Sequence, residues 1–302
     1  MPPDETAAAS PPRKFVGISL RSWVIGICLV ALFNLIRLMI GNGWFDTTKV
    51  VEDENVSVET EENTNGAVVL YAQLTNCSEA TITLTMTLSN MSASCALPLT
   101  VDAKGRSSFE LVSLHPTDTN RASDYDYRYH WEIGRRGDVA TNAFAYHLPY
   151  TDGVHTVMQA DFGTYSHQKG SVDDHAIDFQ MPTGTRVCAA RDGTVVAFRQ
   201  DSAVGAPREK YLYAANYVVV QHEDGTFAEY LHLKQNGVAV SLGQKVKMGE
   251  TLGFSGSTGF SSEPHLHFAV FQTVDGQTRR TFPIWFETKP GKVESLKENK
   301  DY

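Results

Sequence analysis

The chain has 302 residues, of which 42% are hydrophobic and 20% charged, and its formal net charge is −9. This composition excludes a disordered chain and is typical of about two folded domains. The acidic balance argues against nucleic acid as a partner, because a nucleic-acid binder needs a basic surface to contact phosphates. Four cysteines without a CxxC pair exclude a disulfide-rich scaffold and a zinc ribbon.

The N-terminal part of the chain is predicted to cross a membrane once. Residues 22–45 are uncharged apart from Arg37, and as a helix they are long enough to span about 30 Å of hydrocarbon. Three basic side chains precede the span, so we expect residues 1–21 in the cytoplasm and the rest in the periplasm or cell envelope. A cleaved signal peptide is the alternative. Because no clear A-x-A cleavage site follows, an uncleaved anchor in the inner membrane is favoured.

The next two segments are predicted as an acidic stretch and a small β domain. Residues 46–65 carry seven acidic side chains and one lysine, and we expect a solvated juxtamembrane stretch that merges into a first strand. Residues 66–150 contain short β-rich runs between polar turns, which predicts an antiparallel, sandwich-like domain. The predicted strands are 67–74, 80–88, 96–101 and 108–114. Cys77 and Cys95 lie here on the exported side, so a disulfide and two thiols both remain open.

A second all-β unit is predicted over residues 151–290, followed by a polar tail over 291–302. Seven of the ten histidines lie between His155 and His267, among strand-like runs that alternate with Gly-rich turns and show no helical period. The predicted strands are 185–190, 193–198, 216–222, 226–233 and 265–271. The expected fold class is therefore all-β: an N-terminal transmembrane helix, a small β domain and then an antiparallel β domain.

The pair of histidines at 265 and 267 is the first candidate for chemistry in this unit. On a strand, alternate side chains share a face, so both imidazoles would point one way. Leu266 and Phe268 would then point into apolar packing. Two histidines spaced in this way also occur by chance on surfaces, so the pair alone leaves a metal or catalytic use open.

Two other strand-like segments carry isolated polar side chains. Alternation over residues 230–233 predicts that Tyr230 and His232 share a face, while Asp178 has apolar neighbours on both sides. One carboxylate with imidazoles suits zinc, and three protein ligands leave a fourth position for water. The Gly-rich loop 253–264 fits neither a phosphate loop nor a dinucleotide fingerprint. We expect a turn there that lets the backbone pass close to a cleft.

Four motifs follow one another over roughly residues 163–271: D-F-x-x-P-x-G-T, Y-x-H-L, S-G-x-T-G and P-H-L-H-F. This ordered set resembles the lysostaphin-like zinc metallopeptidases, which cut peptide cross-links in peptidoglycan. The resemblance implies a compact antiparallel β fold with zinc in a groove. It implies Asp178 and His267 as zinc ligands and His232 and His265 as catalytic residues. Zinc would activate water for attack on the peptide bond, and the catalytic histidines would move protons and stabilise the oxyanion.

The sequence departs from the family at the third zinc ligand. The usual ligand is a histidine four residues before the aspartate, where this chain has Asp174. His175 lies three residues before Asp178, so on a regular strand it would face away from the metal and would need a bulge. His167 resembles the ligand of a variant subgroup in which a Ser-His pair precedes the aspartate by an extra loop. We predict His167 as the third ligand, with His175 as the alternative and Asp174 as a further one.

The predicted function is that of a membrane-anchored zinc endopeptidase acting on the peptide stems of peptidoglycan, with other cell-wall enzymes as possible partners. The alternative is a non-catalytic family member that binds the wall or regulates another cell-wall hydrolase, because the first zinc motif is altered. A metal-dependent carbohydrate-binding or cupin-like protein would also use two histidines on a strand, but the ordered motifs disfavour it.

Overall fold

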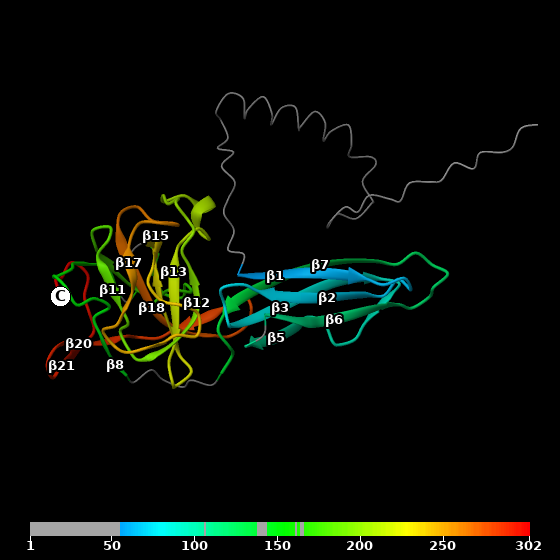
Figure 1. Cartoon of the computed structure of the whole chain (residues 1–302), viewed down its shortest axis with the longest axis horizontal. Helices are drawn as coiled ribbons and strands as arrows, with labels where there is room; N and C mark the ends of the chain where they lie inside the picture. Colours follow the sequence, from blue (N-terminus) through cyan, green and yellow to red (C-terminus); the bar gives the residue numbers. More distant parts are fainter. Residues whose placement is uncertain (1–54, 106, 138–143, 161, 164–165) are drawn as a thin grey trace, which may run out of the picture.

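The computed structural model describes residues 55–105, 107–137, 144–160, 162–163 and 166–302 (Figure 1). These residues form 21 β-strands and one short 3₁₀ helix, Glu209–Tyr211, so the all-β class is confirmed for them. In the described part of the chain, no helix is long and apolar enough to span a bilayer. The predicted cytoplasmic segment 1–21 and membrane anchor 22–45 lie outside the described residues.

The first β unit consists of two antiparallel sheets packed face to face. One sheet has the order β1 (Val56–Glu62), β2 (Val68–Leu74), β6 (Ser108–Pro116) and β4 (Met91–Ala93). The other has the order β5 (Leu99–Lys104), β3 (Glu79–Ser89) and β7 (Asp124–Ile133). Leu70 from the first sheet and Ile82 and Leu84 from the second are completely buried in one cluster, which makes the unit a sandwich.

The second β unit is built on an eight-stranded sheet. Its order is β16 (Lys245–Val246), β12 (Gly193–Arg199), β13 (Tyr217–Gln221), β14 (Phe227–Leu231), β18 (His265–Thr273), β10 (Ile177–Gln180) and β9 (Val157–Gln159), with β19 (Arg279–Thr281) also paired to β18. Two three-stranded sheets accompany it: β11 (Arg186–Cys188), β17 (Thr251–Ser255) and β15 (Leu233–Val238), and β21 (Lys292–Glu294), β20 (Trp285–Lys289) and β8 (Ala145–His147). The pairings between these strands are antiparallel except that of β8 with β20.

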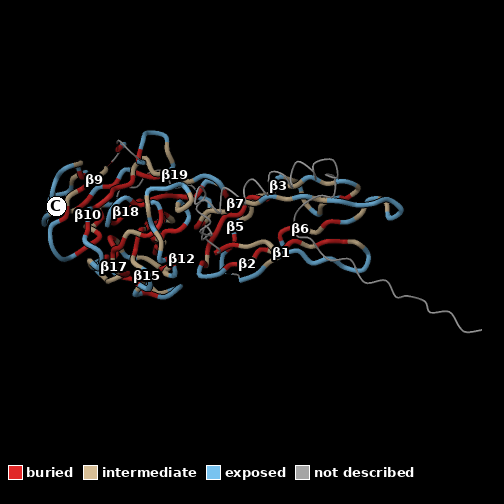
Figure 2. The backbone as a smooth tube through the Cα atoms, turned by 90° about the horizontal axis from the view of Figure 1, so that it is seen from above, coloured by how far each residue is buried: buried red, intermediate tan, exposed pale blue. Residues whose placement is uncertain are grey.

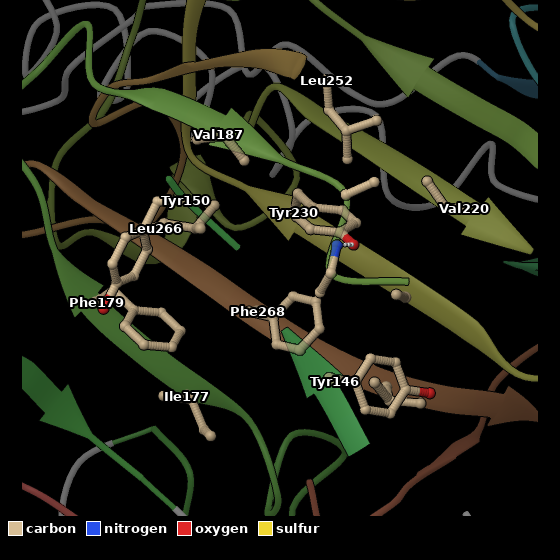
Figure 3. Packing of buried hydrophobic residues seen from close by; sticks show 14 of the residues in the cluster. Tyr146, Tyr150, Ile177, Phe179, Val187, Val220, Tyr230, Leu252, Leu266 and Phe268 are labelled. Atoms are coloured by element: carbon tan, nitrogen blue, oxygen red, sulfur yellow. Dashed lines mark hydrogen bonds between the residues drawn. The ribbon is translucent and has the colours of Figure 1, made fainter. Parts of the chain in front are cut away.

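One face of the eight-stranded sheet packs against the smaller sheets and forms the core of this unit (Figure 3). Tyr230 of β14 and Phe268 of β18 point into this core with ring centroids 5.1 Å apart. The Tyr230 hydroxyl oxygen accepts a hydrogen bond of 2.9 Å from the backbone N–H of Ala190. Leu266 and Phe268 are completely buried here, which confirms the prediction that they point into apolar packing.

The opposite face of the same sheet packs at one end against the first β unit. Val219 and Phe271 from the sheet belong to the same buried cluster as Ile82 of the sandwich. The Thr273 hydroxyl donates a hydrogen bond of 2.5 Å to the carbonyl of Ile133, at the end of β7. One buried cluster therefore includes residues of both units, and Figure 2 shows buried segments in each of them. The other end of this face, at the start of β18, carries the candidate site.

Three segments near the predicted domain limits contribute more structure than their composition suggested. Residues 56–62 of the predicted acidic stretch form β1, because Val56 is buried and pairs with Leu74 of β2. Strand β8, predicted within the first domain, pairs with β20 of the second unit. In the predicted polar tail, Leu296 is buried and the Tyr302 carbonyl accepts a hydrogen bond from the N–H of His155. A few apolar side chains in each polar segment are enough to hold it against the fold.

No disulfide joins Cys77 and Cys95 in the structure. Cys77 is buried at the junction of the two units, beside Ala197, and its thiol donates to the carbonyl of Glu79 at 3.4 Å. Cys95 follows β4, which pairs with the end of β6 around Leu114. The sandwich therefore keeps these two thiols at different ends of its strands.

Candidate metal centre

Strands β10 and β18 bring two of the predicted metal ligands into contact. They pair antiparallel with Asp178 directly opposite His267, and Asp178 Oδ1 lies 3.1 Å from His267 Nδ1. Ile177 and Phe179, on either side of the aspartate, are buried in the core on the other face of the sheet. The strand register thus joins a carboxylate and an imidazole that are 89 residues apart in the chain.

His167 completes a group of three from the loop between β9 and β10. Its Nε2 lies 3.4 Å from Asp178 Oδ1, and its ring centroid lies 5.1 Å from that of His267. One possible ligand atom from each residue lies within 4.8 Å of the others, and all three residues are buried. The structure therefore brings together the three side chains that were predicted as zinc ligands.

The side chain of Gln159 on β9 ties this loop to the aspartate. Its Nε2 donates to Asp178 Oδ2 at 2.9 Å and to Ser166 Oγ at 3.1 Å, while its Oε1 accepts from the N–H of Ser166. Gln159 is also the strand partner of Asp178. One amide therefore holds both the carboxylate and the residue that precedes His167.

His175 and Asp174, the alternative ligands, point away from the group of three. The His175 ring packs on Phe162 with 4.9 Å between ring centroids. The Asp174 carboxylate accepts a hydrogen bond of 2.7 Å from the hydroxyl of Thr281. Because both residues precede β10, which starts at Ile177, strand alternation does not set their direction.

His232 reaches the site because the backbone leaves the strand geometry at this residue. Its φ is +65°, in the left-handed region that residues other than glycine rarely adopt. The prediction that Tyr230 and His232 share a face is wrong, because Tyr230 is buried in the core on the other face. Strand β14 ends at Leu231, and the following turn swings His232 to the site. Its ring centroid lies 4.4 Å from that of His265 and 6.0 Å from that of His267.

Backbone carbonyls orient both candidate catalytic imidazoles. The Nδ1–H of His232 donates to the carbonyl of Thr258 at 2.7 Å, and that of His265 donates to the carbonyl of Glu263 at 2.8 Å. Each imidazole then keeps Nε2 as the nitrogen that can accept a proton. The Nε2 of His265 lies 4.0 Å from Asp178 Oδ1, so it points toward the candidate ligands.

The Gly-rich loop 253–264 supplies these carbonyls and packs tightly against a neighbouring segment. Gly259 has a φ of +82°, and a Cβ added to it would lie 2.7 Å from backbone and side-chain atoms of Ala215. No side chain fits this position without displacing its neighbours. The glycine therefore allows the close approach that places the Thr258 carbonyl against His232.

Three charged residues behind His267 were not predicted from the sequence. Glu229 Oε1 lies 3.5 Å from His267 Nε2, and Glu229 Oε2 accepts a hydrogen bond of 2.7 Å from Arg279. Arg279 also donates to Asp173 at 2.5 Å. Glu229 lies in the apolar run of β14, and a buried charge in such a run was the available sequence signal.

The protonation of the group follows from burial and neighbouring charges. Burial and the adjacent imidazoles lower the pKa of His232 to about 3, so it is neutral at pH 7. Burial also lowers the pKa of His167. Burial opposes the charged form of His267, but the neighbouring carboxylates of Asp178 and Glu229 outweigh this and raise its pKa to about 10. The same hydrogen bond lowers the pKa of Asp178 despite its burial.

The donor set fits a zinc ion. Both ring nitrogens of His167 and the Nε2 of His267 are buried without a hydrogen-bond partner. A buried polar atom left in this way costs about 1–3 kcal/mol, and a metal ion on His167 would satisfy one of them. Two imidazoles and one carboxylate within reach of a common point form the ligand set of many catalytic zinc sites.

Comparisons with known proteins find similarity within the second β unit. Residues 173–279 match the model of Peptidase family M23. The peptidoglycan DD-endopeptidase ShyA of Vibrio cholerae is 43% identical over 93 residues, which cover 31% of this chain and 19% of that protein. The glycyl-glycine endopeptidase ALE-1 of Staphylococcus capitis is 34% identical over 108 residues, which cover 35% of this chain and 27% of that protein. The catalytic domain of lysostaphin from Staphylococcus simulans has 27% identity and a TM-score of 0.28, covering 46% of this chain and 86% of that one.

The sheet, the buried imidazoles and the carboxylate together define the second β unit as a domain of the metallopeptidase class. The match to peptidase family M23 over residues 173–279 includes Asp178, His232, His265 and His267. The resemblance found in the four motifs is thereby confirmed. The chain covers about a fifth of the length of the first curated relatives.

Proposed function

We propose that this chain is a zinc-dependent endopeptidase that hydrolyses peptide bonds in the cross-links of peptidoglycan. The observation that carries the proposal is the buried group of His167, Asp178 and His267, with the imidazoles of His232 and His265 directly beside it. The relatives ShyA and ALE-1 are both named as endopeptidases, which supports the reaction class. The two names point to different bonds, a D,D peptide bond for ShyA and a glycyl-glycine bond for ALE-1. The test below therefore includes substrates of both kinds.

The side chains of the site divide the chemical tasks. A zinc ion held by His167, Asp178 and His267 would supply a Lewis acid that activates water and polarises the scissile carbonyl. His232 is neutral and accepts the proton of the attacking water at Nε2. The same proton then passes from His232 to the leaving amine, and His265, when it carries a second proton, would donate its Nε2–H to the developing oxyanion. The carbonyls that accept the two Nδ1–H groups keep both rings in this orientation.

The full-length chain, purified in detergent and depleted of metal with a chelator, provides the test. We expect one zinc ion to rebind per chain and to restore cleavage of cross-linked muropeptides, measured as new amine termini by mass spectrometry. Substrates with D,D cross-links and with glycyl-glycine bridges identify the bond. His232→Ala is expected to bind zinc without cleavage, whereas His115→Ala, on the first β unit, behaves as the wild type. Equal cleavage without metal refutes the zinc mechanism, and bound zinc without any cleavage favours the regulatory alternative.

We also propose that residues 22–45 anchor the chain in the inner membrane and that the second β unit lies on its outer side. The uncharged run and the basic residues before it support this topology. Protease added to spheroplasts should digest the second unit and spare a tag placed at the N-terminus. Deletion of residues 1–45 should move the protein from the membrane fraction to the supernatant. Protection of both parts from protease contradicts the proposed topology.

A further inference from the structure

The buried charges behind His267 form a chain that starts at the imidazole. Glu229 is on β14, on the same face of the sheet as His267, because it pairs with Ala269 of β18, two residues after His267. Glu229 is buried, with 5% of the residue exposed. Its Oε1 has no hydrogen-bond partner and lies 3.5 Å from His267 Nε2, which also has none. The two atoms therefore face each other, and a shift of a few tenths of an ångström makes a hydrogen bond.

Arg279 holds Glu229 in this position from the other side. It donates to Glu229 Oε2 at 2.7 Å and to Asp173 at 2.5 Å, and its guanidinium lies 4.8 Å from the ring centroid of Phe271. These contacts leave the arginine little freedom to turn. Its two carboxylate partners also raise its pKa well above the usual value despite its burial, so it stays charged. The orientation of Glu229 is therefore set by an ion pair that is largely buried, with side chains 6% and 12% exposed.

The same contacts argue against a second metal ion here. Asp173, Glu229 and His267 place possible ligand atoms within 4.8 Å of one another. The Arg279 guanidinium already contacts both carboxylates and supplies the positive charge that they need. Of the Glu229 carboxylate, the arginine leaves Oε1 available, and this atom faces the imidazole.

We propose that Glu229, held by Arg279, is a positioning residue that fixes His267 with its proton on Nε2 and its lone pair on Nδ1. Nδ1 is the atom that contacts Asp178, so the lone pair would point to the metal position. The inference rests on the proposed function, because it assigns a task to a candidate zinc ligand. A carboxylate that accepts the second N–H of a ligating histidine fixes the ring and raises its basicity.

Glu229→Gln is the test in the full-length chain, because it keeps the size of the side chain and removes its charge. Arg279 would hold the amide oxygen, so the amide NH₂ would face His267 Nε2 and favour the opposite tautomer. We expect zinc affinity, measured by competition with a chelator, to fall about 10- to 100-fold. Arg279→Lys keeps the charge but not the two-pronged contact, so a smaller loss is expected. The ¹⁵N shifts of the His267 ring in the zinc-loaded protein report which nitrogen binds the metal.

Glu79→Gln is the matched control. Glu79 is buried, paired with Arg135 at 3.0 Å and located at the junction of the two units, so its substitution also removes the charge of a buried glutamate that pairs with an arginine. We expect wild-type zinc affinity and wild-type ¹⁵N shifts from this variant. Wild-type affinity and shifts in Glu229→Gln overturn the inference while the proposed function stands. A wild-type chain that binds no zinc overturns both.

Discussion

On strand β18, alternate side chains enter two different environments. Leu266, Phe268 and Val270 pack into the apolar core beneath the small sheets. His265 and His267 point to the opposite face, where Phe271 further along the strand packs against the first β unit. The first face contains side chains that stabilise the fold by burial, whereas the second buries imidazoles and carboxylates at a cost unless each finds a partner.

The two faces of this sheet have different roles: one stabilises the fold, and the other carries the candidate site. The apolar face supplies a rigid base, so the register that brings Asp178 opposite His267 is held by side chains that take no part in the reaction. On the other face, the first β unit covers the end around Phe271 and leaves the end around His267 for the site. Substitutions on the two faces should therefore affect different measurements.

The largest expected effect is on metal binding at the polar face. His167→Ala removes one of three candidate ligands, and we expect zinc affinity to fall by roughly 1,000-fold, or about 4 kcal/mol. His175→Ala is the matched control, because that ring packs on Phe162 outside the group. Competition with a chelator measures both variants. Loss of zinc in His175→Ala alone would show that the assignment of the third ligand is wrong.

On the apolar face, Phe268→Ala should destabilise the fold. The side chain is completely buried between Tyr230, Tyr146 and Phe286, so truncation leaves a cavity and costs about 3–5 kcal/mol. Val274→Ala, at an exposed position just after the same strand, should cost less than about 0.5 kcal/mol. Denaturant unfolding measures both changes. A Phe268 variant as stable as the wild type would contradict the role assigned to this face.

Acid should weaken the apolar face through His222. This buried imidazole packs on Tyr146 and donates its Nδ1–H to the Asp192 carbonyl, and burial with the nearby charge of Arg191 lowers its pKa to about 4. The unfolded chain binds the proton at about pH 6.5, so the folded state loses stability as the pH falls from 6.5 to 4. We expect this residue to account for up to about 3 kcal/mol of the loss.

His222→Asn isolates that contribution, because other buried histidines also take up protons on unfolding. Free energies of unfolding measured at several pH values should show a shallower acid slope for this variant than for the wild type. His115→Asn, at an exposed position of the first unit, should leave the slope unchanged. Identical slopes for the wild type and the His222 variant would contradict the prediction.

The smallest expected effect concerns the amide that joins the His167 loop to Asp178. Gln159→Ala should lower zinc affinity about 10-fold, or roughly 1.4 kcal/mol, because the ligands keep their chemistry but lose a shared anchor. Gln221→Ala removes a similar contact, from an amide to the Glu79 carboxylate, at the junction end of the sheet. This control should bind zinc as the wild type does. Equal zinc affinities of Gln159→Ala and the wild type would show that the loop needs no anchor at Gln159.

Most of the structure that could be predicted followed from the alternation of side chains along the strands. This alternation placed His265 and His267 on one face and Leu266 and Phe268 on the other, because the direction of successive side chains on a strand is a local property. The same rule was available for β7, where aromatic and polar residues alternate from Asp124 to Ile133, although this strand was not predicted. The four motifs identified the family because their order is specific.

Alternation was not sufficient where the backbone leaves the strand or where distant segments meet. The positive φ of His232 reversed its expected direction, and the loop that carries His167 has no period from which its direction follows. Residues 229 and 279 are 50 positions apart, so their ion pair depends on the register of three strands.

The sequence by itself therefore determined the all-β class, the family and the faces of the strand-borne residues, since these depend on local patterns and ordered motifs. Only the tertiary structure decided that His167 joins Asp178 and His267, that Gln159 and Glu229 support them, and that the first unit covers one end of the same face. The physical reason is that such contacts arise from long-range pairing, which no period within a single strand encodes.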